Sequence, residues 1–122
     1  MKFYELELNG RTVKLRLTNS DCITIEEKAK KKMLDYIQDY SISTLTNLLM
    51  YMVRSSEPTF SLKQAGALYD ELVDNGYTIE KILYDVIYEG LVVSGFLTSD
   101  QLADIKAVKE QLEKQEKSVS QK

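Results

Sequence analysis

The sequence predicts an α+β fold that is predominantly α-helical, with an N-terminal β-hairpin packed on a bundle of about five helices. The first seventeen residues alternate polar and apolar side chains around Asn9-Gly10, a pattern typical of a hairpin. Beyond them, apolar residues recur at three- and four-residue spacing between capping motifs, as in amphipathic helices. The chain has 122 residues. We therefore expect a single domain, 1–116, followed by a disordered tail, 117–122.

The predicted hairpin covers residues 3–17. Asn-Gly is the favoured two-residue turn because both positions of a type I′ turn need a positive φ. With that turn, paired residue numbers sum to 19, so that Leu6 faces Val13 and Glu5 faces Lys14. Apolar side chains then meet apolar ones and acid meets base, which stabilises the pairing. An isolated hairpin is only marginally stable, so its apolar face should pack on the helices.

Capping motifs separate the predicted helices. The segment 18–21, Thr-Asn-Ser-Asp, is rich in N-cap residues. Ser61 with Gln64, and Thr98 with Gln101, fit the capping box, in which the two side chains hydrogen-bond to each other's backbone N–H groups. Asn75-Gly76 suits a helix end because glycine accepts the left-handed conformation. The expected helices are about 21–32, 33–40, 44–54, 61–74, 78–93 and 99–116.

The helix at 78–93 is apolar on more than one side, and such a helix is usually buried on more than one side. In so short a chain, one of these sides is a candidate protein interface. The eight tyrosines support this interpretation because tyrosine is favoured at interfaces, although ordinary packing at the edge of the core explains Tyr84 and Tyr88 equally well. The last helix has a narrow apolar stripe. The candidate interface residues are Tyr84, Tyr88, Leu91, Val92, Leu102 and Ile105.

The composition provides no evidence of a reaction. There is no histidine, so His-containing catalytic pairs and zinc sites are excluded. Cys22 is the only cysteine and is interpreted as a buried structural thiol. The acidic pairs Glu26-Glu27 and Asp35/Asp39 are interpreted as solvated. We predict no enzyme activity, no catalytic, metal or cofactor-binding residues, and no cofactor.

Charge and hydropathy indicate the partners and the cellular location of the protein. Its net charge is −3, which argues against nucleic acid as the main partner because phosphate attraction dominates that affinity. The lysines of 28–32 allow two interpretations: a basic patch for an acidic partner, or a solvated helix end matched to the helix dipole. No segment has the apolar run of a signal peptide or a membrane span. We therefore expect an intracellular protein that does not bind membranes.

The order of these segments resembles the tail assembly chaperones of long-tailed phages and prophages of Gram-positive bacteria. The resemblance covers about residues 3–95. It begins with the hairpin Y-x-L-x-L-N-G-R-x-V-x-L-R-L at 4–17 and the charged helix ITIEEKAKKK at 23–32. It continues with SISTLTNLLMYMV at 41–53 and the helix pair SLKQAGALYDELVDNGYTIEKILYDVIYEGL at 61–91. No single motif carries it; the order and spacing do.

The resemblance implies a non-catalytic function. A chaperone of this kind keeps the long tape measure protein soluble and recruits tail tube subunits, so its expected partners are those two proteins and copies of itself. It would be found in the cytoplasm of the bacterial host and be absent from the mature virion. Two alternatives remain: a small structural or connector subunit of the phage particle, and a small phage or bacterial regulatory protein that binds through the lysines of 28–32.

Overall fold

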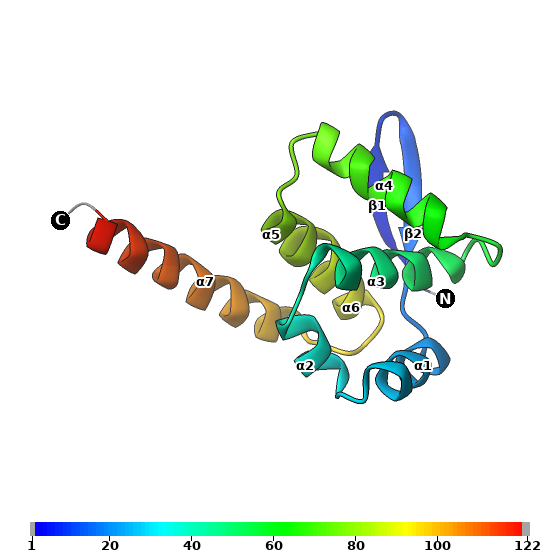
Figure 1. Ribbon diagram of the computed structural model, residues 1–122, viewed down its shortest axis with the longest axis horizontal. Helices are drawn as coiled ribbons and strands as arrows, with labels where there is room; N and C mark the ends of the chain where they lie inside the picture. The colour runs from blue at the N-terminus through cyan, green and yellow to red at the C-terminus, as the bar shows by residue number, and fades with distance from the viewer. Residues whose placement is uncertain (1, 121–122) are drawn as a thin grey trace.

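The computed structural model describes the backbone of residues 2–120 and the side chains of residues 2–114, and its fold is α+β and predominantly helical, as predicted (Figure 1). The hairpin consists of β1 (Tyr4–Leu8) and β2 (Arg11–Leu15). The first four helices are α1 (Asn19–Ala29), α2 (Met33–Gln38), α3 (Ile42–Arg54) and α4 (Leu62–Asp74). A fifth helix consists of α5 (Ile79–Ile82), the π-helical turn η1 (Leu83–Ile87) and α6 (Tyr88–Val93), and the sixth is α7 (Ser99–Ser120).

The hairpin has the predicted register. Leu6 pairs with Val13 and Glu5 pairs with Lys14 in the antiparallel ladder. Asn9 and Gly10 have φ values of 51° and 80°, the left-handed conformations that a type I′ turn requires. The inner face of the hairpin is buried against the helices, with Leu8 and Leu15 among its buried residues. Local turn chemistry and the alternation of apolar residues therefore determine this element.

The tip of the hairpin binds α4 through the Glu71 carboxylate. Arg11 donates two hydrogen bonds from its guanidinium to the Glu71 carboxylate, and the Asn9 amide donates a third over 2.6 Å. Both donors lie at the tip of the hairpin, so the turn that sets the strand register also presents the groups that bind α4. The Arg11 and Asn9 hydrogen bonds lower the pKa of Glu71 from 4.5 to about 2.

We expect this depressed pKa to make part of the stability depend on pH. The unfolded chain binds a proton at Glu71 near pH 4.5, whereas the folded chain does so only near pH 2. The contribution is therefore complete above about pH 4.5 and is lost as the pH falls toward 2. Urea titrations of the wild type and of Glu71→Gln should differ in free energy of unfolding at neutral pH and converge across that window. A difference in free energy of unfolding that stays constant down to about pH 2 would contradict the prediction. The control is Asp70→Asn, at an exposed residue next to Glu71.

Helix α3 forms the centre of the molecule. It packs against β2, α2, α4 and η1, and it is buried on nearly all sides. Met50 and Tyr51 lie outside the inner stripe that the sequence predicts for this helix, yet they are only 7% and 9% exposed. They are covered from the other side, where Ile25 of α1 and Tyr36 of α2 lie near them. Helix α3, rather than the helix over 78–93, is thus the element most enclosed by the rest of the chain.

The helix predicted over 78–93 is present but is not a uniform α-helix. At η1 the backbone widens into a π turn, in which the Tyr88 N–H donates to the Leu83 carbonyl five residues earlier. The Tyr4 hydroxyl of β1 donates to the Asp85 carbonyl within this turn, over 3.0 Å. A π turn inserts one extra residue into the helical spiral. It therefore rotates the residues after it relative to an ideal helix, which a sequence pattern of period 3.6 does not reveal.

Gly90 leaves room on α6 for the end of the Met52 side chain. The sequence suggests that Gly90 ends or bends the helix, but α6 runs through it to Val93. A Cβ atom built at Gly90 would lie 2.0 Å from the terminal methyl group of Met52 on α3. The side chain of Met52 is fully buried. The Met52 methyl group therefore occupies the space that a larger residue at position 90 would take.

Several helix ends differ from the predicted bounds. Helix α1 ends at Ala29 rather than near residue 32, because Lys30 adopts the left-handed conformation with φ of 54°. Helix α2 ends at Gln38, two residues before the predicted end. Helix α7 continues to Ser120, past the predicted end at 116. Helical backbone thus extends over 117–120 of the expected disordered tail, while 121–122 lie outside the described residues, and the disorder of this tail stays a prediction.

Candidate functional site

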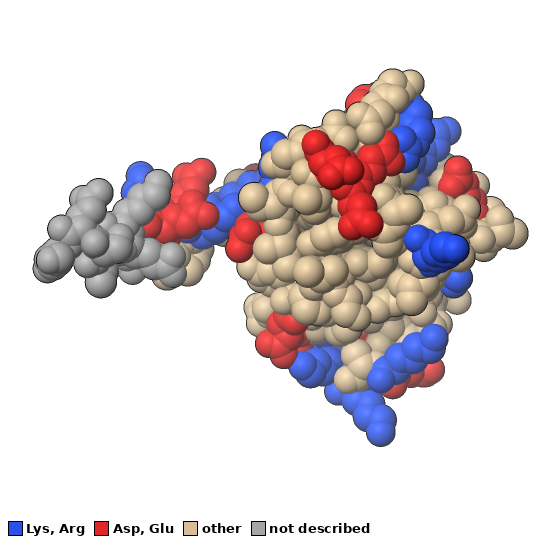
Figure 2. Space-filling model, turned by 45° about the horizontal axis from the view of Figure 1, so that its top comes forward, with Lys and Arg blue, Asp and Glu red and all other residues tan. Residues whose placement is uncertain are grey.

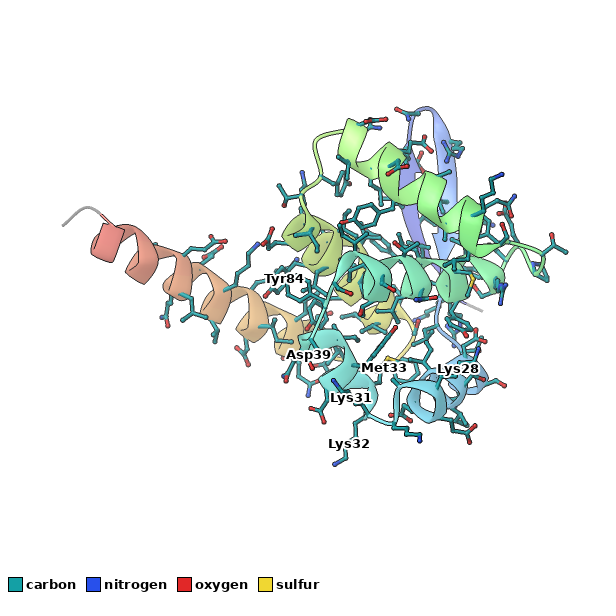
Figure 3. The ribbon with its side chains drawn as sticks, in the orientation of Figure 1. Lys28, Lys31, Lys32, Met33, Asp39 and Tyr84 are labelled. Carbon is teal, nitrogen blue, oxygen red and sulfur yellow. The ribbon has the colours of Figure 1, made fainter. Side chains whose placement is uncertain are left out.

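The strongest candidate site is a groove at the base of α7, which we call the tyrosine groove. It encloses about 390 Å³ between α2, the η1–α6 segment and α7. Leu34 comes from α2, Tyr84 from η1 and Tyr88 from α6. Figure 3 shows Tyr84 on the side from which α7 projects. The apolar residues that α7 contributes to its lining are Ile105, Val108 and Leu112.

Two tyrosine rings form one wall of the tyrosine groove. The Tyr84 and Tyr88 rings lie 5.5 Å apart between centroids and are tilted by 33°, a favourable geometry for an aromatic pair. Burial raises the pKa of both hydroxyls above the usual value of 10.0. Both hydroxyls are therefore neutral across the physiological range. The half-buried Tyr84 ring offers apolar area to a ligand without presenting a charge.

The first turns of α7 are anchored to the η1–α6 segment. Leu102 is only 5% exposed. Lys106 forms ion pairs with Glu89 at 3.1 Å and with Asp85 at 3.6 Å, and the Lys109 ammonium lies 4.5 Å from the centroid of the Tyr84 ring, a cation–π contact. These contacts fix the direction in which α7 leaves the body.

Beyond these contacts, α7 projects from the body (Figure 1). Its length of 22 residues corresponds to roughly 33 Å. Val108 and Leu112 continue the apolar stripe of Leu102 and Ile105, yet they are 57% and 55% exposed. Leu34, across the groove, is 45% exposed. Isolated helices are marginal in water and gain most of their stability from packing an apolar face. The projecting part of α7 thus presents an apolar face that its own domain does not cover.

The structure separates the six predicted interface residues into two groups. Tyr84, Tyr88 and Ile105 line the tyrosine groove. Leu91 is fully buried in the core and Leu102 anchors α7, so in this conformation neither is available to a partner. Val92 is half-buried and packs against the core. Tyr88 is only 6% exposed, so most of its area already serves the fold.

Three exposed apolar lining residues are absent from the predicted interface: Leu34, Val108 and Leu112. The signal for Val108 and Leu112 was present, because they extend the helical stripe of Leu102 and Ile105 at the same spacing. Periodicity identifies an apolar face but cannot show whether the same chain covers it. Leu34 had no such signal, because the short helix α2 has no clear apolar stripe. In the structure its neighbour Met33 is buried, while Leu34 itself is exposed.

The remaining candidates from the sequence are used structurally. Cys22 is buried, and burial, with a smaller effect of Glu26, raises the pKa of its thiol. The Glu26 carboxylate accepts the Met33 N–H over 2.9 Å and so caps the start of α2. Asp39 pairs with Lys31 at 2.7 Å, and that hydrogen bond lowers the pKa of Asp39. Among the described side chains, those of residues 2–114, no group of three or more Asp, Glu, His or Cys residues is arranged to hold a metal ion.

The lysines of 28–32 do not converge on one point. The Lys28 ammonium contacts the Tyr51 hydroxyl at 3.4 Å, Lys31 pairs with Asp39, and Lys32 points away from the body (Figure 3). In the view of Figure 2, basic and acidic side chains alternate around a broad area without charged groups. Within the part of the chain that the structure describes, no helix combines the length and apolar character needed to cross a membrane.

Comparison of the chain with protein-family models, with curated proteins and with solved structures gives no match.

Proposed function

We propose that this protein is a non-catalytic binding protein that holds an amphipathic helix of a partner in the tyrosine groove. The observation that carries the proposal is the uncovered apolar face formed by Val108, Leu112 and Leu34 beside the Tyr84 ring. An amphipathic helix binds by placing apolar residues at successive turns into a groove of this kind. Charged side chains such as Asp104 and Lys109 line the same groove and suit its polar rim.

This activity is the one that a phage tail assembly chaperone needs, and we propose that role in the bacterial cytoplasm. Its client would be the tape measure protein, whose long helical chain offers many amphipathic segments, and tail tube subunits would be recruited to the complex. Copies of the chaperone would associate along one client. Multiple weak grooves on one long chain give high avidity without any single tight contact. The proposal rests on the order of segments at 4–91 together with the uncovered face of α7.

A double substitution tests the groove. Val108→Glu with Leu112→Lys keeps the net charge and creates a favourable i,i+4 ion pair on a helix, so helical content and thermal stability should be retained. Capture of the co-expressed tape measure protein should fall at least about tenfold, because about 2 kcal/mol of apolar contact is lost. The readout is the amount of tape measure protein that remains soluble and co-purifies.

The matched control changes two apolar residues that are similarly exposed but lie elsewhere. Ile23 on α1 and Val73 on α4 are 55% and 47% exposed. Ile23→Lys with Val73→Glu also leaves the net charge unchanged and should capture the tape measure protein as the wild type does. Equal loss in both double variants, or none in the groove variant, would refute the assignment of the groove. Presence of the protein in purified virions would instead favour a structural subunit.

A further inference from the structure

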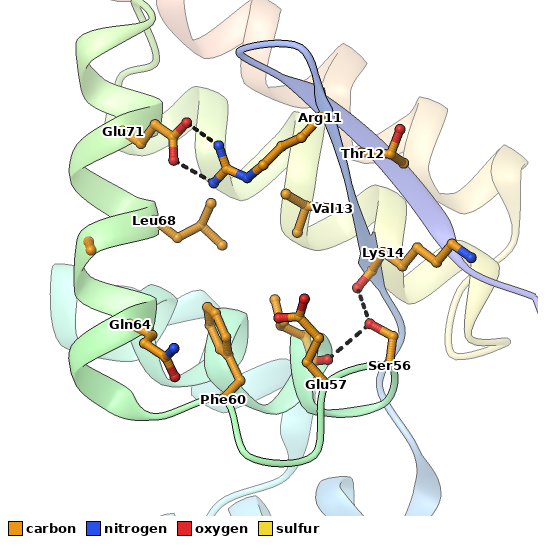
Figure 4. Close-up of a pocket in the computed structure, with 12 residues that line it drawn as sticks. Arg11, Thr12, Val13, Lys14, Ser56, Glu57, Phe60, Gln64, Leu68 and Glu71 are labelled. Atoms are coloured by element: carbon orange, nitrogen blue, oxygen red, sulfur yellow. Dashed lines mark hydrogen bonds and ion pairs between the residues drawn. The ribbon is translucent and has the colours of Figure 1, made fainter.

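A second hollow lies between β2 and α4, away from the tyrosine groove (Figure 4). It encloses about 490 Å³. Val13, Val53, Phe60 and Leu68 supply its apolar surface. The Arg11–Glu71 ion pair crosses from β2 to α4 at one end, and Ser56 approaches the β2 backbone at the other (Figure 4). The hollow therefore follows the strand for about the length of 11–14.

The hollow runs along the free edge of the hairpin. In a two-residue hairpin the pair next to the turn exchanges hydrogen bonds, and such pairs alternate with non-bonded pairs along the ladder. Leu8–Arg11 and Leu6–Val13 are therefore bonded pairs, and Thr12 and Lys14 direct their N–H and C=O groups away from β1. Both residues line the hollow.

These outward backbone groups are almost entirely unpaired within the described residues. The Lys14 carbonyl accepts only the Ser56 hydroxyl, at 3.4 Å, and the backbone of Thr12 forms no hydrogen bond on this side. The free edge stops at Arg16, whose N–H donates to the Met52 carbonyl over 3.1 Å. An exposed strand edge is a template on which another chain can pair.

We propose that this hollow binds an extended segment of a partner protein as a third strand beside β2, with an apolar side chain opposite Val13 and an acidic side chain opposite Lys14. Backbone bonds to Thr12 and Lys14 would hold the strand. The residue opposite Val13 points to the inner face of the sheet, where Val53, Phe60 and Leu68 provide an apolar surface. Its neighbour opposite Lys14 points to the solvent face.

Charge decides the class of occupant. Arg11 is already bound to Glu71, and the Arg16 guanidinium donates to the Lys2 carbonyl. Lys14 is therefore the basic side chain of β2 that a third strand meets on the solvent face, while Glu57 and Glu71 also line the hollow. On its paired side, β2 meets Glu5 opposite Lys14 and Glu7 opposite Thr12. A strand on the free side meets the same row, so acidic residues at alternate positions stabilise it. A second copy of β2 would place basic side chains beside basic ones, and a helix would leave the Thr12 backbone groups without partners.

The proposal is independent of the tyrosine groove, because no residue lines both hollows. A client could therefore be held at two places, by a helix at α7 and by an acidic, extended segment at β2. Two linked contacts raise the effective affinity well above that of either alone.

The test uses a blocked peptide, Ser-Glu-Phe-Glu-Ser, which reads the same in either strand direction. Binding to the full-length protein is followed by backbone amide chemical shifts. We expect shifts at Thr12, Val13 and Lys14, and none along α7. The same peptide with every backbone amide N-methylated cannot donate to the strand edge in either direction and should bind at least about tenfold more weakly.

Three protein variants complete the test. Thr12→Pro removes an N–H that no ladder bond uses and should abolish peptide binding, whereas Thr12→Val should bind as the wild type does. Lys14→Glu should weaken binding about tenfold, and a peptide with Lys in place of both Glu residues should reverse that preference. If Thr12→Pro does not fold, the change of peptide preference in Lys14→Glu still tests the proposal. Shifts confined to the tyrosine groove, no shift at millimolar peptide, or unchanged preference in Lys14→Glu would overturn the proposal.

Discussion

Gly90→Val is expected to lower the free energy of unfolding by about 2–3 kcal/mol. A Cβ at this position would lie 2.0 Å from the terminal methyl and 3.7 Å from the sulfur of Met52. The Met52 side chain is fully buried, so its methyl group must move to a new position within the core. Valine adds two further methyl groups to the same contact. Urea denaturation followed by circular dichroism measures the effect.

Gly66 provides the matched control. It also lies within a helix, α4, but a Cβ there meets no heavy atom within 4 Å. Gly66→Ala should therefore stabilise the protein by up to about 1 kcal/mol, the gain in helix propensity. Gly90→Ala has the same gain offset by the Met52 contact, so the difference between the two alanine variants measures the steric cost. A Gly90→Val protein as stable as the wild type would refute the packing argument.

A second substitution identifies the neighbour that causes the cost. Met52→Ala alone should destabilise the protein by about 2–5 kcal/mol because it leaves a cavity. Combined with Gly90→Val, it removes the methyl group that the valine would strike, and the valine occupies part of the cavity. The double variant should therefore be more stable than the sum of the two single effects predicts. Strict additivity would show that Met52 is not the residue in conflict.

Tyr88→Ala is expected to destabilise the protein by about 3–5 kcal/mol, the usual cost of removing a buried aromatic ring. Tyr88 is 6% exposed and packs in the core cluster. Tyr84 is half-buried at the rim of the tyrosine groove, so Tyr84→Ala should cost only about 1–2 kcal/mol. Thermal unfolding of the two single variants, compared under identical conditions, checks the ranking.

This ranking decides between the two interpretations of the tyrosine pair. If both rings belonged to an interface alone, replacing either would change association with a partner and leave stability intact. We expect Tyr84→Ala to weaken association at only a small cost in stability, and we expect Tyr88→Phe to be close to the wild type because the ring volume is kept. If Tyr88→Ala were as stable as the wild type, Tyr88 would belong to the interface and not to the core.

The sequence alone predicted the elements whose causes are local. The hairpin register follows from Asn9-Gly10 and the alternation around it, and the structure has that register. The capping boxes at Ser61–Gln64 and Thr98–Gln101 form the expected reciprocal hydrogen bonds. Each of these features depends on residues within a few positions of one another, so that a short stretch of sequence contains all the interactions that determine it.

The candidate site could be predicted only in part for the same reason. The stripe from Leu102 to Leu112 is a property of one helix, and its spacing is visible in the sequence. Whether it is covered depends on where α7 leaves the body, and that direction is set by Lys106 with Glu89 and by Lys109 with Tyr84. These contacts join residues far apart in sequence, which periodicity does not detect.

The sequence by itself determined the hairpin, the helices and the caps of this protein, because turn geometry, backbone hydrogen bonding and apolar spacing act over a few residues. Only the tertiary structure decided which helix is enclosed, where the helix over 79–93 widens into a π turn, and which apolar face remains uncovered. Tyr51 and Val108 illustrate the difference. Both are apolar or aromatic helical residues, yet one is buried between helices and the other is exposed, because burial depends on which distant segments pack against each side chain.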